Sequence, residues 1–187
     1  MCNPPLLAIF SDAGGAALAQ RDWMSSDPPI PEGVVLESLS SRTSVAEDQA
    51  VLFVTPAVYG IEQVEQVCNT ISRQNSDHRP VVLLNPQLQD AATVGVGLSG
   101  RRLQQRFINT FEPCYYLRPL GNGALFRVYP YPWTIWTQDS ETGEYQLLDT
   151  TDSQPSGEDL AEIFARNYPS TNSFWAGLRR FLQALQR

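Results

Sequence analysis

The chain has 187 residues, the size of one ordinary domain, and with 42% hydrophobic residues it can bury a sizeable core. Its 20 acidic and 13 basic residues give a formal net charge of -7, which opposes the phosphate attraction that dominates nucleic-acid binding, so DNA and RNA are excluded as partners. The apolar stretches are far shorter than the roughly 20 residues of a membrane-spanning helix. Because the first residues also lack a secretory signal, we expect a cytoplasmic protein.

In the first half of the chain, three apolar runs are each followed by a segment with helical periodicity. The predicted strand and helix pairs are Leu6–Phe10 with Asp12–Trp23, Ala50–Val54 with Ile61–Ser72, and Pro80–Leu84 with Gly100–Phe111. A further strand is expected at Val34–Leu39, and Leu18 and Ala19 are expected to face inward from the first helix. Ala50–Val54 is apolar without alternation, which is typical of a strand buried on both faces. Parallel strands need crossover helices, so this order predicts an α/β fold with a Rossmann-like, three-layer, mostly parallel sheet.

After Pro113 the pattern changes to hairpins. Two strands, Cys114–Leu120 and Ala124–Tyr129, flank Gly121-Asn122-Gly123, where Asn-Gly is expected to supply the positive φ angles of a tight turn. Thr134–Thr137 and Tyr145–Asp149 predict a second hairpin, so this end is expected to be antiparallel. A helix follows to about Asn167, capped by Ser156. We expect one α/β domain over residues 1–168 and an amphipathic helix over residues 169–187.

One glycine-rich stretch has the form G-x-G-x-x-G and is followed by two arginines. The residues that could hold an anion there are Gly95, Gly97, Ser99, Gly100, Arg101 and Arg102. A helix start with two guanidinium groups suits a phosphate. However, the motif lies about ten residues beyond its strand rather than on the immediate turn, so a glycine loop needed only for backbone geometry is the alternative.

Any small ligand is expected in the crevice at the carboxyl ends of the parallel strands. That crevice would bring Asp12, Thr55, Asn85 and Arg101 near one another. Asp12 would repel a phosphate at the start of the first helix, so capping that helix is its expected role.

The sequence contains no recognisable catalytic or metal-binding set. His78 is the single histidine, and a Cys114–His78 pair would need a hydrogen-bonded geometry that nothing in the sequence indicates. Cys68 and Cys114 are interpreted as small buried hydrophobic residues. We therefore expect no catalytic residue, metal or cofactor.

Two segments are candidates for contact with a partner or a membrane. The first is aromatic and contains Tyr129, Tyr131, Trp133 and Trp136, which either form a binding surface or cover the open side of the sheet. The second is Ser170–Arg187, a basic amphipathic helix. Its apolar stripe consists of Phe174, Trp175, Leu178, Phe181, Leu182 and Leu185. This helix either packs on the domain, lies on an anionic membrane surface or binds a partner.

Several motifs resemble a cyanobacterial and chloroplast family known mainly as a domain of unknown function. They begin with Phe10-Ser11-Asp12-Ala13-Gly14 and include Arg79-Pro80-Val81-Val82-Leu83-Leu84-Asn85-Pro86, Gly97-Leu98-Ser99-Gly100-Arg101-Arg102-Leu103 and Phe111-Glu112-Pro113-Cys114-Tyr115-Tyr116-Leu117-Arg118-Pro119. The family includes low photosystem II accumulation protein three and a region following a chloroplast adenylate kinase. The resemblance implies photosynthetic biogenesis but supplies no catalytic residues.

From this resemblance we expect a non-enzymatic accessory factor in photosystem II assembly or maintenance, bound peripherally on the cytoplasmic side of the thylakoid membrane. Its expected partner is a photosystem or another thylakoid protein complex. One alternative is a nucleotide- or phosphate-binding domain that uses Gly95–Arg102. Another is a stable structural subunit of a photosynthetic assembly.

Overall fold

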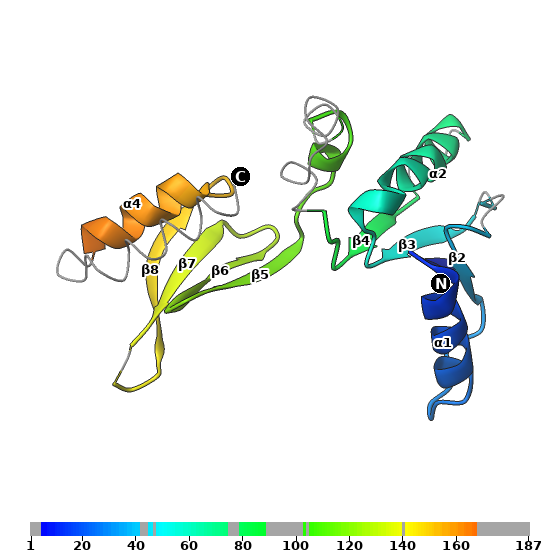
Figure 1. Ribbon diagram of the computed structural model, residues 1–187, viewed down its shortest axis with the longest axis horizontal. Coiled ribbons are helices and arrows are strands. Elements are labelled where there is room, and N and C mark those ends of the chain that lie inside the picture. Colours follow the sequence, from blue (N-terminus) through cyan, green and yellow to red (C-terminus); the bar gives the residue numbers. More distant parts are fainter. Residues whose placement is uncertain are drawn as a thin grey trace. The chain divides into compact units, whose positions relative to one another are not determined.

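Figure 1 shows the computed structural model of the protein, which describes residues 5–41, 45–46, 48–74, 79–88, 103, 105–139 and 141–167. The chain divides into two compact units, Met1–Phe107 and Ile108–Arg187. Each unit has its own sheet, and each is described by itself below. The expectation of a single domain over residues 1–168 stays a prediction.

The first unit contains a four-stranded parallel sheet in the order β2-β1-β3-β4. The strands are β1 (Leu6–Phe10), β2 (Val34–Ser38), β3 (Ala50–Val54) and β4 (Val81–Leu84). Its helices include α1 (Ala13–Met24), the 3-10 helix η1 (Val58–Gly60) and α2 (Ile61–Arg73). The α/β class and these strands are confirmed. The predicted helix Gly100–Phe111 is only partly described, and its described end includes the 3-10 helix η3 (Ile108–Thr110), which belongs to the second unit.

Strand β1 carries buried side chains on both faces, whereas β3, which was predicted to be buried on both faces, alternates: Val51 and Phe53 are buried, and Ala50, Leu52 and Val54 are only partly buried. On one face, Ala8 and Phe10 pack with Ala19 of α1. Adjacent residues of a strand point to opposite faces, so Leu7 and Ile9 lie on the other face, next to Val51 and Phe53 across the register; all four are buried.

One prediction about α1 is wrong. Ala19 is buried, but Leu18 is 53% exposed. The helix packs through Ala16 and Ala19, and the ring of Trp23 contacts that of Phe10 at 5.8 Å. These three positions share one face of a helix, and Leu18 lies off it.

The second unit contains a four-stranded antiparallel sheet in the order β5-β6-β7-β8. Its strands are β5 (Tyr115–Leu120), β6 (Gly123–Val128), β7 (Trp133–Gln138) and β8 (Tyr145–Thr151), and the helix α4 (Gly157–Asn167) follows them. The predicted antiparallel hairpins are confirmed. The Ser156 hydroxyl accepts a hydrogen bond from the Asp159 N–H at 3.1 Å, so the predicted cap of α4 is also confirmed.

The turn between β5 and β6 differs in detail from the prediction. Positive φ occurs at Gly121, with a value of 45°, and not at Asn122 or Gly123. Gly at the first of two loop positions is enough to reverse the chain in a hairpin. Gly123 already belongs to β6, where a side chain would overlap the Trp136 carbonyl oxygen.

The core of the second unit lies between one face of the antiparallel sheet and α4 (Figure 1). It consists of Leu120, Leu125, Trp133, Ile135, Leu160, Ile163 and Phe164. None of the helices in the described part of the chain has the length and apolar character that a bilayer crossing demands.

Candidate functional site

The carboxyl edge of the parallel sheet carries the residues that follow three of its strands, the central strands β1 and β3 and the edge strand β4. Ser11 and Asp12 follow β1, Thr55 follows β3, and Asn85 follows β4. The chain passes from β1 outward to β2 and then returns to the other side of β1, so the strand order reverses between β1 and β3. Open α/β sheets bind ligands at such a switch point. Asp12, Thr55 and Asn85 thus share the expected edge, whereas Arg101 lies outside the described residues.

Asp12 is the N-cap of α1. Its backbone is extended (φ -140°, ψ 163°), and its Oδ1 accepts a hydrogen bond from the Gly15 N–H at 2.8 Å. A Cβ at Gly14 would lie 3.1 Å from the same oxygen, so the small residue leaves room for the cap. The predicted capping role is confirmed. A carboxylate already occupies the helix end, which makes this end a poor site for a second anion.

The ends of β3 and β4 share an uncommon backbone conformation. Thr55 and Asn85 both have φ of 47°, and each precedes a proline. Asn tolerates this left-handed region, but a β-branched threonine there costs about 1–3 kcal/mol. Pairing on either side holds the backbone in place: the Thr55 N–H donates to the Leu84 carbonyl at 2.8 Å, and the Ser11 hydroxyl donates to the Thr55 carbonyl at 2.6 Å. These hydrogen bonds fix the backbone at the carboxyl edge of the parallel sheet. No feature of the sequence at Thr55 predicted its positive φ.

A second candidate surface is the side of the antiparallel sheet that faces away from α4, here called the outer face. The register assigns alternate residues of each strand to it. Its members are Tyr115, Leu117 and Pro119 from β5; Ala124, Phe126 and Val128 from β6; Thr134, Trp136 and Gln138 from β7; and Tyr145, Leu147 and Thr150 from β8. None of these side chains is charged.

The aromatic segment after β6 divides between surface and core. Tyr129 and Tyr131 are 57% and 69% exposed, and Trp136 is half-buried on the outer face. Trp133 is only 2% exposed: it contacts the Tyr116 ring at 5.1 Å, and the Arg127 guanidinium lies 5.2 Å from its ring centre. Trp133 is therefore a core residue, and it can affect a contact with a partner only by holding β7, the strand that follows the turn, in place.

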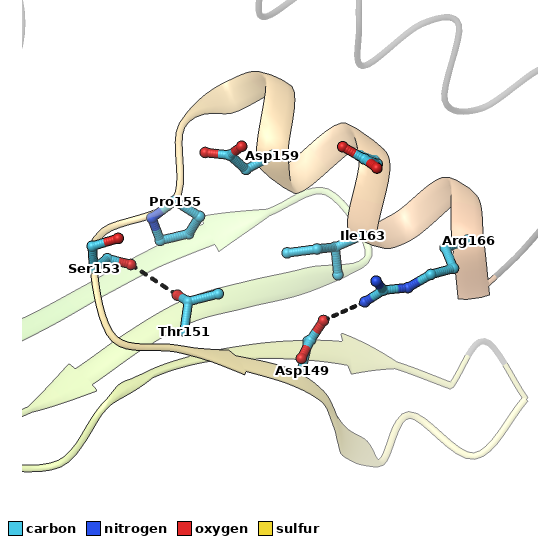
Figure 2. A pocket seen from close by; sticks show the side chains of 8 residues that line it. Asp149, Thr151, Ser153, Pro155, Asp159, Ile163 and Arg166 are labelled. Atoms are coloured by element: carbon cyan, nitrogen blue, oxygen red, sulfur yellow. Dashed lines mark hydrogen bonds and ion pairs between the residues drawn. The ribbon is translucent and has the colours of Figure 1, made fainter.

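An open pocket of about 380 Å³ lies between β8 and α4 (Figure 2). Its lining residues are Asp149, Thr151, Ser153, Pro155, Asp159, Glu162, Ile163 and Arg166. Figure 2 shows Arg166 pointing to Asp149, with which it forms a 2.6 Å ion pair. Asp159 is held in the cap of α4 by the Ser156 N–H at 2.8 Å, and hydrogen bonding to Ser156 lowers the pKa of this carboxyl. The Asp149 carboxylate thus joins β8 to α4, whereas the Asp159 carboxylate caps the start of α4. Sequence reasoning gave no sign of this pocket.

The comparison with protein families decides the classification. Residues 2–162 match the family model described as Domain of unknown function (DUF1995). The chain belongs to this family. The match covers the edge of the parallel sheet, the whole antiparallel sheet and the start of α4. No solved structure matches this DUF1995 protein.

The two described cysteines of the DUF1995 protein differ in environment. Burial, followed by the nearby Glu65 carboxylate, raises the pKa of the Cys68 thiol to about 12, so this thiol stays protonated. Cys114 is exposed, and its thiol donates to the Glu112 carbonyl at 3.4 Å. The interpretation of Cys114 as buried is wrong, because the residue precedes β5 outside the sheet core.

Several predicted sites lie outside the described residues. They are the glycine-rich stretch Gly95–Arg102, His78 with its proposed pairing to Cys114, and the C-terminal helix Ser170–Arg187. Within the described ranges, no three His, Cys, Asp or Glu side chains gather as metal ligands.

Proposed function

We propose that this DUF1995 protein is a non-enzymatic accessory factor that acts through protein contacts in the assembly or maintenance of photosystem II. It works on the cytoplasmic side of the thylakoid membrane, and its partner is a photosynthetic complex. The resemblance of its sequence motifs to a family that includes low photosystem II accumulation protein three supports this role. The aromatic turn between β6 and β7 supplies the contact.

The exposure of Tyr129 and Tyr131 is the observation that carries the proposal. Both rings stand on a turn whose backbone is fixed: the Tyr129 N–H donates to the Cys114 carbonyl at 2.8 Å, and the Tyr131 N–H donates to the Val128 carbonyl at 2.9 Å. Tyrosines on rigid backbone offer a large contact area at low entropic cost, so they are favoured as binding hot spots.

Replacing both tyrosines by serine in the native photosynthetic cell tests the proposal. The Tyr129→Ser, Tyr131→Ser protein should accumulate normally, while photosystem II falls toward the level of a strain without the gene. Tyr59→Ser is the matched control, because Tyr59 is 75% exposed on the first unit. Normal photosystem II in both the double variant and the gene-deletion strain would contradict the role; a normal level in the double variant alone would contradict the contact.

A second candidate function is nucleotide or phosphate binding by the first unit. It is favoured by the parallel sheet, whose order β2-β1-β3-β4 has a switch point beside the α1 N-terminus. In this reading the sheet is part of a Rossmann-like three-layer unit and Gly95–Arg102 binds the anion. Calorimetric titration with adenine nucleotides tests it: binding that Arg101→Ala, Arg102→Ala abolishes supports it, and no heat at millimolar ligand removes it.

A further inference from the structure

Arg127 is a charged side chain on the apolar face of the antiparallel sheet, the side that carries the core of the second unit. The register places it on the same face as Leu125 and opposite Tyr116 of β5. Its side chain is only 11% exposed, although arginines are almost never buried unless they are paired. Its guanidinium donates to the Glu112 carboxylate and lies over the Trp133 ring. The Nε atom is buried and has no hydrogen-bond partner among the described residues.

The stability of the fold does not explain a guanidinium at this position. Taking a charge out of water is unfavourable, and a buried N–H without a hydrogen bond adds to that cost. Replacing a buried ion pair by apolar side chains of similar volume is often neutral or stabilising. Glu112 is 56% exposed, so its carboxylate stays hydrated when its partner is removed. Arg127→Met should therefore leave the fold at least as stable, and the arginine has another role.

The contacts of Arg127 lie at the base of the aromatic turn. The register between β6 and β7 extends to Phe126 and Thr134, and Arg127 and Trp133 are the next residues along the two strands. The guanidinium lies 5.2 Å from the centre of the Trp133 ring, a distance at which a cation is attracted to the ring face. A contact between side chains thus links the two strands where their backbone pairing ends.

This link holds both ends of the turn that carries the exposed tyrosines. Tyr129 comes two residues after Arg127, and Tyr131 comes two residues before Trp133. An arginine suits the position because its planar guanidinium can stack on a ring while its N–H groups bind a carboxylate, whereas a lysine ammonium is a single point charge.

We propose that Arg127 is a positioning residue, which fixes the direction in which both tyrosines of the aromatic turn meet the partner. This inference rests on the proposed function, because it assigns Arg127 a role in the same contact. Its first test needs no partner and can be made on the purified full chain.

Amide hydrogen exchange measures whether Arg127 orders the turn. The Tyr129 and Tyr131 N–H groups are the reporters, because each donates to a backbone carbonyl and exchanges when the turn opens. In Arg127→Met both should exchange at least about tenfold faster, while the core amide of Ile135 and the melting temperature do not fall below the wild type in protection or stability. Arg127→Lys keeps the charge but loses the stacked plane, so it should also accelerate both amides.

Arg118→Met is the matched control for these measurements. Arg118 is on the same face of the sheet in β5, opposite Leu125 and farther from the turn, so its replacement should leave both tyrosine amides unchanged. Unchanged exchange in both Arg127 variants would overturn the inference. Equal acceleration of the Ile135 amide, which would indicate general destabilisation, or an equal effect of the control would overturn it as well.

Affinity purification from native cells separates this inference from the proposed function. Recovery of photosystem II subunits should fall about tenfold with Arg127→Met, because two mobile tyrosines lose rotamer freedom on binding, and should stay at the wild-type level with Arg118→Met. Normal recovery with Arg127→Met would overturn the positioning role. If the wild type itself recovers no photosystem II subunit, the proposed function fails, and the exchange rates still decide whether Arg127 positions the tyrosines.

Discussion

Replacing Gly123 by alanine should destabilise the second unit, because β6 and β7 approach too closely there for any side chain. The new Cβ would overlap the Trp136 carbonyl oxygen and lie 3.1 Å from its carbon and 3.3 Å from the Thr137 Cα. All three are backbone atoms, so none can rotate away. Next to them, the Gln138 N–H donates to the Asn122 carbonyl at 2.7 Å and fixes the spacing of the strands.

The size of the effect follows from two opposing contributions. Overpacking costs about 1–3 kcal/mol, and a clash with backbone places Gly123→Ala near the upper end. Reduced freedom of the unfolded chain returns about 0.4–1 kcal/mol. The net loss is about 2 kcal/mol, which lowers the melting temperature of a unit of this size by roughly 8–16 °C.

Thermal and urea unfolding followed by circular dichroism measure this loss. Gly15→Ala is the matched control: its Cβ would make only ordinary contacts, the nearest at 3.6 Å, and alanine favours a helix over glycine by about 0.5–1 kcal/mol. Replacing glycine by alanine should therefore lower the free energy of unfolding at position 123 and raise it at position 15. A Gly123→Ala protein that melts within about 2 °C of the wild type would refute the close strand approach.

Three further predictions concern single side chains. Asp12→Ala removes the cap of α1 and should cost about 1 kcal/mol in urea unfolding, whereas an unchanged midpoint would deny the cap. Hydrogen bonding to Ser156 lowers the pKa of the Asp159 carboxyl, so the charged carboxylate stabilises the fold above the ordinary pKa of about 3.9, and this stabilisation is lost as the pH falls through the lower pKa of the folded state. Asp159→Asn should therefore flatten the fall of the melting temperature between about pH 5 and pH 2. Melting temperatures of wild type and variant that fall in parallel with pH would exclude this linkage. At about pH 8 iodoacetamide should label Cys114 well before Cys68, whose thiol is held protonated, and equal labelling in peptide mass spectrometry would contradict the burial of Cys68.

The strands of the parallel sheet could be predicted closely from the sequence. Ala50–Val54 is a strand over the predicted residues, although only its alternate residues Val51 and Phe53 are fully buried. The inward face of α1 was predicted less well, since its small residues leave the hydrophobic pattern weak. Neither the positive φ of Thr55 nor that of Gly121 follows from the pattern, because each depends on the neighbouring strand.

The outer face could not be predicted for a related reason. β5 has apolar residues on both sides, with Leu117 facing outward and Leu120 facing α4, so periodicity does not tell which side is covered. That choice depends on the register across the strands and on the position of α4. The aromatic turn was found because tyrosines between prolines are conspicuous, but only the structure separates exposed Tyr131 from buried Trp133.

The central claim is that the protein acts by contacting photosystem II through Tyr129 and Tyr131. Affinity purification from native cells, with quantification of photosystem II subunits, tests it most directly. We expect these subunits to co-purify with the wild-type protein and with Tyr59→Ser, and to be lost with Tyr129→Ser, Tyr131→Ser. Equal recovery with all three proteins, or no photosystem II subunit with the wild type, would contradict the claim.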